Sequence, residues 1–156
     1  MDYRSVAGFS YVDRLIGWSG FWNQDMVATF PLPILDARPT QLYINERKLA
    51  ALEARYPHGS EARMEPVPVT RLRGTVAFTD GHTRAFLAWK RGLGEIAAYW
   101  DDSELDMETY STCFDWCQEE GIRAIADLAS RIIDDAAYQA KWIARCETIG
   151  LNEKDG

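Results

Sequence analysis

The spacing of apolar and polar residues predicts short strands and helices between residues 27 and 102. Runs of apolar or alternating residues predict extended chain, whereas apolar positions three and four residues apart predict amphipathic helices. Gly, Pro, Asn and Asp mark the turns and helix ends between these segments. We expect extended chain at 27–35 and 41–44, a helix from an Asn45 cap to about Tyr56, a hairpin of 66–72 with 75–78, a helix over 82–91 and a strand at 96–100.

From Asp106 onward the pattern is helical. The first helix carries apolar residues at i, i+3, i+4 and i+7, namely Tyr110, Cys113, Phe114 and Cys117, and Gly121 is placed to end it. The second carries Ile122, Ile125, Leu128 and Ile132, and the third begins near Asp134. At the other end of the chain, an apolar stripe between Tyr11 and Trp22 predicts a short helix.

Mixed strands and helices followed by a run of helices predict an α+β protein. A chain of 156 residues is long enough for one well-buried core and too short for two domains of the usual size. We therefore expect a single domain over 1–156, with an N-terminal helical segment at 1–27, a small mixed sheet with flanking helices at 28–102, and an acidic helical extension at 103–156.

The net charge of −7 is unevenly distributed along the chain. Residues 1–100 hold 12 Lys or Arg against 10 Asp or Glu, whereas residues 101–156 hold 5 against 14. The acidic end would repel a phosphate backbone, so direct DNA binding is disfavoured. The acidic C-terminal helices instead offer a surface to a protein partner.

The cysteines and the first residues bear on the compartment and on metal binding. The three cysteines form no Cys-x-x-Cys pair, and charged residues interrupt the N-terminal apolar positions that a secretory signal would need. No apolar stretch approaches the roughly 20 residues of a membrane-spanning helix, so we expect a reduced, cytoplasmic protein outside the membrane. Cys113, Cys117 and Cys146 have spacing that would allow a metal site, but such a stripe is more often core, and we expect no structural metal.

Residues 76–89 contain the segment whose order best suits a ligand. An apolar run ends in Thr79-Asp80-Gly81, and a helical pattern begins with His82, Thr83 and Arg84 in its first turn. Exposed N–H groups at a helix start carry partial positive charge, a glycine lets a phosphate approach the backbone, and an arginine adds a planar fork of donors. The sequence therefore predicts an anion site at residues 79–84.

The order of elements and this turn resemble the ParB/sulfiredoxin-type domain over roughly residues 28–102. Those domains hold nucleotide phosphates with a Gly-x-x-Arg turn at the start of a helix. The turn reads Gly-Glu-Arg-Arg in ParB partition proteins, Gly-Cys-His-Arg in sulfiredoxin and Asp-Gly-His-His-Arg in free-serine kinases. Asp80, Gly81, His82 and Arg84 match the last of these, and Thr83 replaces its second histidine.

The resemblance implies that residues 79–84 bind the phosphates of ATP, ADP or CTP, with Mg²⁺ held by Asp80 and the phosphate oxygens. It also implies catalytic roles for His82, as a donor or proton shuttle, and for Glu46, which lies where related kinases carry an acid near the transferred phosphoryl group. Sulfiredoxin chemistry is excluded because its nucleophilic cysteine would fall on His82, which supplies no thiolate.

Each of these residues can also be explained by a purely structural role. Asp80 can simply form the turn, His82 can lie on the surface, and Arg84 can extend from the helix to pair with an acid. Glu46 can merely favour the start of its helix. The acidic pair at 101–102, after the last strand, lies near the same cleft or is solvated, and Trp89 or Trp100 would flank a base.

Three classes of function remain. The first is a small Mg²⁺-dependent NTPase or kinase-like phosphotransferase. The second is a nucleotide-binding or protein-interaction module without turnover, regulatory and associated with a plasmid or chromosome. The third is a domain that has lost its ligand. An acyl-CoA-dependent acetyltransferase would use Gly92-Leu93-Gly94 for pyrophosphate, but Trp89 does not fit its motif, and that motif should open a helix.

Overall fold

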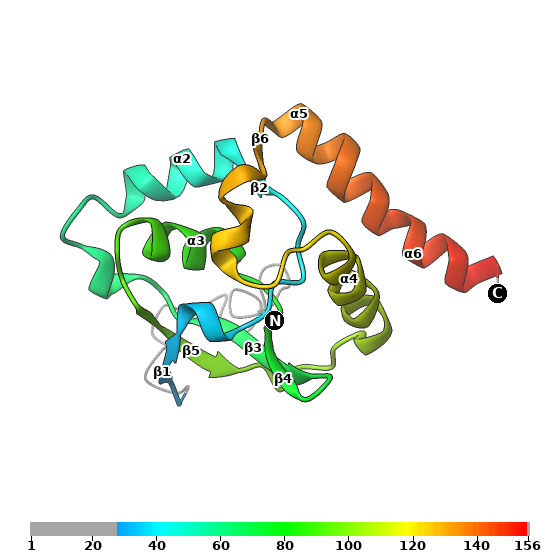
Figure 1. Ribbon diagram of the computed structural model, residues 1–156, viewed down its shortest axis with the longest axis horizontal. Coiled ribbons are helices and arrows are strands. Elements are labelled where there is room, and N and C mark those ends of the chain that lie inside the picture. The colour runs from blue at the N-terminus through cyan, green and yellow to red at the C-terminus, as the bar shows by residue number, and fades with distance from the viewer. Residues whose placement is uncertain (1–27, 156) are drawn as a thin grey trace, which may run out of the picture.

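The computed structural model describes residues 28–155 and shows the predicted α+β fold, with a curled four-stranded sheet on one side and helices on the other (Figure 1). The helix expected between Tyr11 and Trp22 lies outside the described residues. The sheet contains β1 (Phe30–Pro33), β3 (Val67–Leu72), β4 (Thr75–Phe78) and β5 (Glu95–Trp100), in the order β1-β5-β3-β4. The β3–β5 pair is parallel, and the other two pairs are antiparallel.

The predicted strands and turns of the sheet are confirmed. The β3–β4 hairpin turns at Arg73 and Gly74, whose φ values of +56° and +77° suit the twist of a two-residue hairpin loop. β1 lies at the sheet edge, where Pro31 and Pro33 interrupt no central ladder. Its extended chain stops earlier than the expected residue 35, because a 3₁₀ turn, η2 (Ile34–Asp36), follows.

Two helices lie between the strands. α2 (Glu46–Arg55) begins at Asn45, whose side chain accepts hydrogen bonds from the N–H groups of Arg47 and Lys48, as expected of a cap. A short 3₁₀ turn, η3 (Glu61–Arg63), then leads into β3. α3 (His82–Lys90) connects β4 to β5, which confirms the predicted strand, helix, strand unit.

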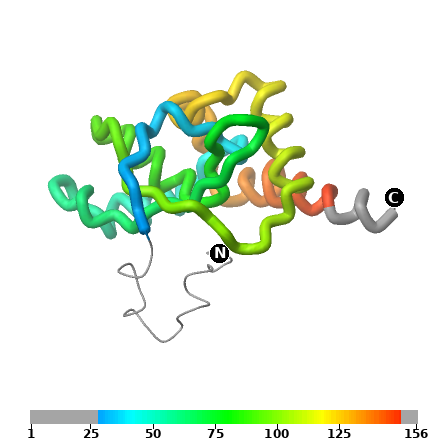
Figure 2. The backbone as a smooth tube through the Cα atoms, turned by 90° about the horizontal axis from the view of Figure 1, so that it is seen from below, coloured from blue at the N-terminus to red at the C-terminus, as the bar shows by residue number. Residues whose placement is uncertain are grey.

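The C-terminal third packs onto the sheet and helices as a run of short elements. α4 (Met107–Glu119) is followed by the 3₁₀ helix η4 (Ile125–Ser130), β6 (Ile132–Ile133), α5 (Asp135–Tyr138), the π-helical turn η5 (Gln139–Ile143) and α6 (Ala144–Asp155). Figures 1 and 2 show the last three of these elements as one helical run that passes α4. The run confirms the helix predicted from Asp134, whose carboxylate accepts a 2.8 Å hydrogen bond from Ala137 N.

The prediction of one helix from Ile122 to Ile132 is wrong. Only Ile125–Ser130 is helical, and Ile132 belongs to β6, which pairs in parallel with β2 (Ile44–Asn45). The backbone N–H of Ile44 also donates to Arg131 O at 3.0 Å. These long-range bonds replace the local bonds that would have continued the helix. The strand expected at 41–44 is likewise reduced to β2, since only Ile44 and Asn45 meet a partner strand.

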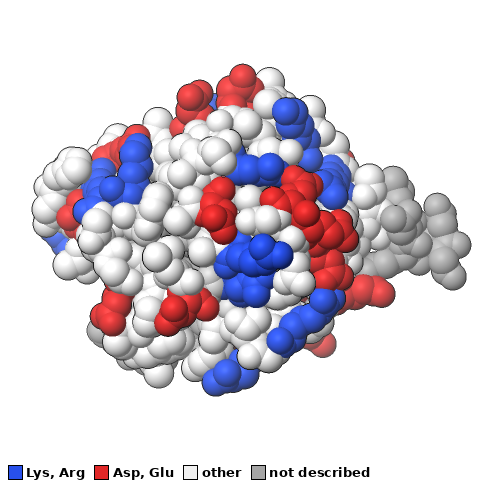
Figure 3. Space-filling view, in the orientation of Figure 1, with Lys and Arg blue, Asp and Glu red and all other residues white. Residues whose placement is uncertain are grey.

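Several acidic residues of the C-terminal third pair with arginines. Asp115 binds Arg73, Asp135 binds Arg47, and Glu120 lies between two arginines, Arg131 and Arg145. On the face shown in Figure 3, basic and acidic side chains lie side by side and not in separate fields. Within residues 28–155, no helix combines the length and apolar content needed to cross a membrane.

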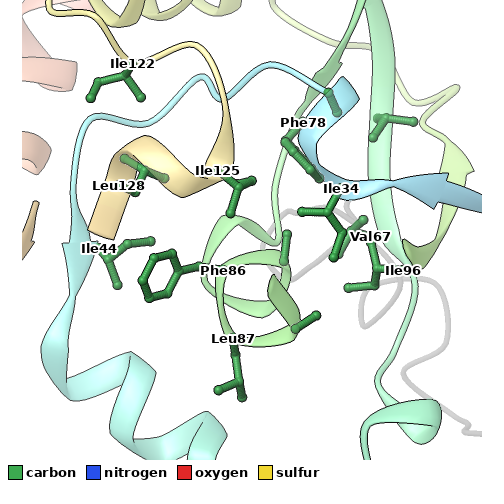
Figure 4. Close-up of a cluster of buried hydrophobic side chains, with 14 of the residues drawn as sticks. Ile34, Ile44, Val67, Phe78, Phe86, Leu87, Ile96, Ile122, Ile125 and Leu128 are labelled. Carbon is green, nitrogen blue, oxygen red and sulfur yellow. The ribbon is translucent and has the colours of Figure 1, made fainter. Parts of the chain in front are cut away.

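The main apolar cluster of the core includes residues from both the sheet region and the C-terminal third. A smaller cluster contains Leu72, Ala77 and Phe114. Figure 4 shows α3 at the centre of the main cluster, with Ile34, Val67 and Ile96 on the sheet side and Ile44 and Leu128 on the other. α3 buries His82, Ala85, Phe86, Leu87 and Ala88, so it is covered on most of its circumference. This burial fixes the position of its first turn.

Replacing Asn45 should test how strongly β2, α2 and α5 depend on one another. Asn45 is 1% exposed, caps α2 and donates from Nδ2 to Asp135 Oδ1 at 2.9 Å. Asn45→Ala should therefore lower the free energy of unfolding in urea by about 2 kcal/mol or more. Asp106→Ala, which removes the exposed cap of α4, is the control and should cost about 1 kcal/mol. An Asn45→Ala cost no larger than this control would contradict the expectation.

Candidate functional site

The turn at residues 80–81 leads into α3 without a side-chain cap. Gly81 adopts a left-handed conformation with φ +75°, and its N–H donates to Asp80 Oδ1 at 2.8 Å. No side chain caps α3, and its first backbone hydrogen bond runs from Ala85 N to Gly81 O at 2.9 Å. The N–H groups of residues 82–84 are thus left without a partner inside the helix, as at any uncapped helix start.

Arg84 folds back over this glycine. A Cβ atom built on Gly81 would lie 2.9 Å from Arg84 Nη2 and 2.8 Å from Val67 Cγ1. The Arg84 side chain is 17% exposed, which places its guanidinium against the turn and away from bulk solvent. Glycine is therefore favoured at residue 81 for two reasons, its left-handed backbone conformation and the space that Val67 and the guanidinium occupy.

His82 is buried and not on the surface. It is 3% exposed, and its Nε2 accepts a 2.9 Å hydrogen bond from Thr40 N, which assigns the proton of the neutral ring to Nδ1. Nδ1 is buried and has no hydrogen-bond partner among residues 28–155. Burial lowers the pKa of His82 to about 4, although the Asp80 carboxylate acts in the opposite direction. The ring is thus neutral at pH 7 and enclosed by protein atoms, which makes it a poor proton shuttle.

A groove of about 360 Å³ opens in front of this turn. One wall is a face of α2 with Lys48, Ala51, Leu52 and Arg55 at i, i+3, i+4 and i+7, and the opposite wall is residues 80–84. Gln41 and Tyr138 complete the lining. Its charged side chains are three cations, Lys48, Arg55 and Arg84, against the carboxylate of Asp80. This balance favours an anionic ligand.

Tyr138 brings the C-terminal helical run to the groove. It is buried at the end of α5, and Lys48 Nζ lies 5.6 Å from the centroid of its ring. Burial raises the pKa of the Tyr138 hydroxyl above 10, so the phenol stays protonated. The groove is therefore built from three parts of the chain that are far apart in sequence.

Most of the residues predicted for the site line the groove. Asp80, Gly81, His82, Thr83 and Arg84 do so together. Thr79 does not, because its buried hydroxyl donates to Asp101 Oδ2 at 2.9 Å. Glu46 is exposed in the first turn of α2 and is not part of the lining either.

Sequence reasoning missed the cations of α2 and the contribution of α5. Lys48 and Arg55 were detectable, since they lie seven residues apart on the same helix face as Leu52. Tyr138 gave no comparable signal, because its place at the groove depends on the pairing of β2 with β6. Asp101, from the acidic pair after β5, accepts hydrogen bonds from Thr79 and Ser103 instead of lining the groove.

The remaining metal-binding candidates are separate from the groove. In the described part of the chain, no three His, Cys, Asp or Glu side chains gather as a metal site would require. Cys113 and Cys117 are buried in the core, and burial raises the pKa of the Cys117 thiol to about 12.

The Gly92-Leu93-Gly94 segment leads into β5, whereas an acyl-CoA pyrophosphate loop should open a helix.

No model of a known protein family matches this chain, and no curated protein matches it. Among solved structures, it is similar to protein Atu1540 from Agrobacterium tumefaciens, with 14% identity and a TM-score of 0.44. The match covers 69% of this chain and 62% of that one, so it spans less than two thirds of the length of Atu1540.

Replacing Gly81 should disturb the site through a contact as well as through backbone strain. Gly81→Ala should lower the free energy of unfolding by about 1–3 kcal/mol more than Gly92→Ala does. Gly92 has a comparable φ of +89°, but a Cβ there meets nothing within 4 Å, so it serves as the control for strain alone. Urea denaturation of both variants measures the difference, and equal costs would show that Arg84 and Val67 do not restrict this position.

Because His82 is buried in its neutral form, the free energy of unfolding should decrease as the pH falls. Its folded pKa of about 4 lies below the unfolded value of about 6.5, so the unfolded chain binds more protons between these values. The contribution of neutral His82 to the free energy of unfolding is fully present above pH 6.5. It decreases as the pH falls toward 4, by about 2 kcal/mol between pH 7 and 5. Urea denaturation at these two pH values should show this loss in the wild type.

His82→Gln should remove most of this pH dependence, because glutamine does not titrate. His58→Gln is the control, since His58 is exposed, and should keep it. A wild-type stability that is flat between pH 7 and 5 would mean that His82 is not held neutral by burial.

Proposed function

We propose that the groove binds the phosphates of a nucleotide such as ATP, ADP or CTP. The observation that carries the proposal is the convergence of donors at the start of α3. The uncapped N–H groups of residues 82–84 and the Arg84 guanidinium belong to one turn beside the groove. Such an arrangement is suited to phosphate oxygens. The resemblance of the 80–84 turn to the ParB/sulfiredoxin-type phosphate turn supports the same ligand.

The rest of the groove suits a ligand larger than a phosphate ion. Its volume of about 360 Å³ lies in the range of small-molecule sites. Ala51 and Leu52 supply an apolar wall between the cationic ends of the α2 face, Lys48 and Arg55. A sugar or base would lie along this wall while its phosphates contact residues 80–84.

Asp80 fits the role of a magnesium ligand that acts together with phosphate. One of its carboxylate oxygens accepts the Gly81 N–H, and the residue is exposed and lines the groove. Mg²⁺ typically takes one or two carboxylates together with phosphate oxygens and water, so a single carboxylate is sufficient. The bound ion would supply neutralisation of the phosphate charge.

Binding without turnover is favoured over phosphoryl transfer by the same geometry. A phosphotransferase or NTPase needs a group that orients the acceptor or the attacking water. Glu46 lies outside the groove lining, and His82 is held neutral and buried. Asp80 is the carboxylate that a catalytic version of this proposal would use. Measurement of ATP and CTP hydrolysis separates the two versions.

Thermal denaturation with ATP, ADP, CTP and GTP in the presence of Mg²⁺ tests the proposal. A nucleotide at about 100 times its Kd should add about 2.7 kcal/mol of stability. For a domain of this size, that corresponds to an increase in Tm of about 5–10 °C. If millimolar concentrations of all four nucleotides leave the wild-type Tm unchanged, the proposal is wrong.

Arg84→Ala should weaken nucleotide binding about tenfold or more, because it removes a charge-assisted donor from the turn. Arg123→Ala is the matched control, since Arg123 is exposed and lies outside the groove lining. The control should retain the full increase in Tm. Loss of the increase in both variants would indicate a general effect of net charge.

A further inference from the structure

Two arginines from different helices meet at a single carboxylate beside the groove. Glu65 Oε1 lies 3.5 Å from Arg84 Nη1, and Glu65 Oε2 lies 3.5 Å from Arg55 Nη2. Arg84 and Arg55 both line the groove, whereas Glu65 belongs to the segment between η3 and β3. The carboxylate thus marks a position where one anion reaches guanidinium groups from α2 and α3 at the same time.

Glu65 is held loosely, unlike the other glutamate of its segment. Glu61 is 14% exposed, lies 2.9 Å from Arg91 Nη1 and accepts a 2.9 Å hydrogen bond from Gly59 N. Glu65 is 50% exposed, and both of its ion pairs are longer. Exposed ion pairs at such distances contribute little to stability. Glu61 therefore anchors the segment, and Glu65 is free to leave its partners at low cost.

We propose that Glu65 is a built-in competitor that occupies the position of the ligand's terminal phosphate and must be displaced when the ligand binds. This inference rests on the proposed function. A terminal phosphate carries up to two negative charges and three acceptor oxygens, so it engages two guanidinium groups better than one carboxylate does. The groove consequently prefers ligands that end in a phosphate dianion over ligands whose phosphate is a singly charged diester.

The need to displace Glu65 also lowers the affinity of the groove for its ligand. The ligand gains the contacts of Arg55 and Arg84 but must first break the two pairs with Glu65. A Glu65→Gln substitution removes the competing charge and keeps the size of the side chain, so both arginines become available to the ligand. Anion binding should then become tighter by about five- to tenfold.

Calorimetric titration of the full chain with inorganic pyrophosphate tests this inference. The variants are wild type, Glu65→Gln, Glu53→Gln and the double variant Glu65→Gln with Arg84→Ala. Glu53 is the matched control, because it pairs with Lys90 at 3.3 Å on the surface and its substitution changes the net charge by the same amount. A melting curve of each protein without ligand confirms that it is folded.

The expected result is tighter pyrophosphate binding by Glu65→Gln, wild-type binding by Glu53→Gln, and loss of the gain in the double variant. If wild type binds pyrophosphate and Glu65→Gln binds no more tightly, the inference is wrong while nucleotide binding stands. An equal gain in Glu53→Gln also overturns it, since the effect would then be one of net charge. If no variant binds pyrophosphate or any nucleotide, the proposed function fails together with the inference.

Discussion

The burial of α3 is the constraint on which the groove depends. A helix of nine residues has little stability of its own, so packing must hold it in place. Apolar residues of the sheet cover one side of it, and residues near β2 and η4 cover the other. His82 adds a polar contact at its first residue through the hydrogen bond from Thr40 N. The N–H groups of the first turn are therefore oriented before a ligand arrives, which lowers the entropic cost of binding.

Sequence reasoning succeeded where an element satisfies its own backbone groups locally. Asn45 caps α2, and Gly121 ends α4 with φ +78°, because a cap needs only neighbours in sequence. It failed at Ile132, where apolar spacing indicated a helix but the backbone pairs with Ile44. Periodicity reports which side chains are buried and cannot reveal a partner strand that lies far away along the chain.

The features of the candidate site also separate into those that depend on neighbours in sequence and those that depend on distant segments. The turn at 80–84 was predictable because glycine, arginine and a helix start form one continuous segment. The burial of His82 was not, since it arises from contacts with Thr40 and with the ring of Phe78, whose centroid lies 5.5 Å away. The ion pairs of Glu65 also join segments that no local pattern relates. A short motif therefore predicted the turn and its glycine and arginine, whereas the lining of the groove and the ion pairs of Glu65 required the folded chain.

The parallel pairing of β2 with β6 has a consequence for the order of events during synthesis. Ile44 and Asn45 leave the ribosome long before Ile132, Ile133 and Asp135, which are their partners. A domain generally folds as a unit, and α3 packs against η4 as well as against the sheet, so the 80–84 turn is not fixed in place until the C-terminal third has emerged. Tyr138 closes the groove only after these later residues have docked. A growing chain thus completes the groove only once its C-terminal third has been synthesised.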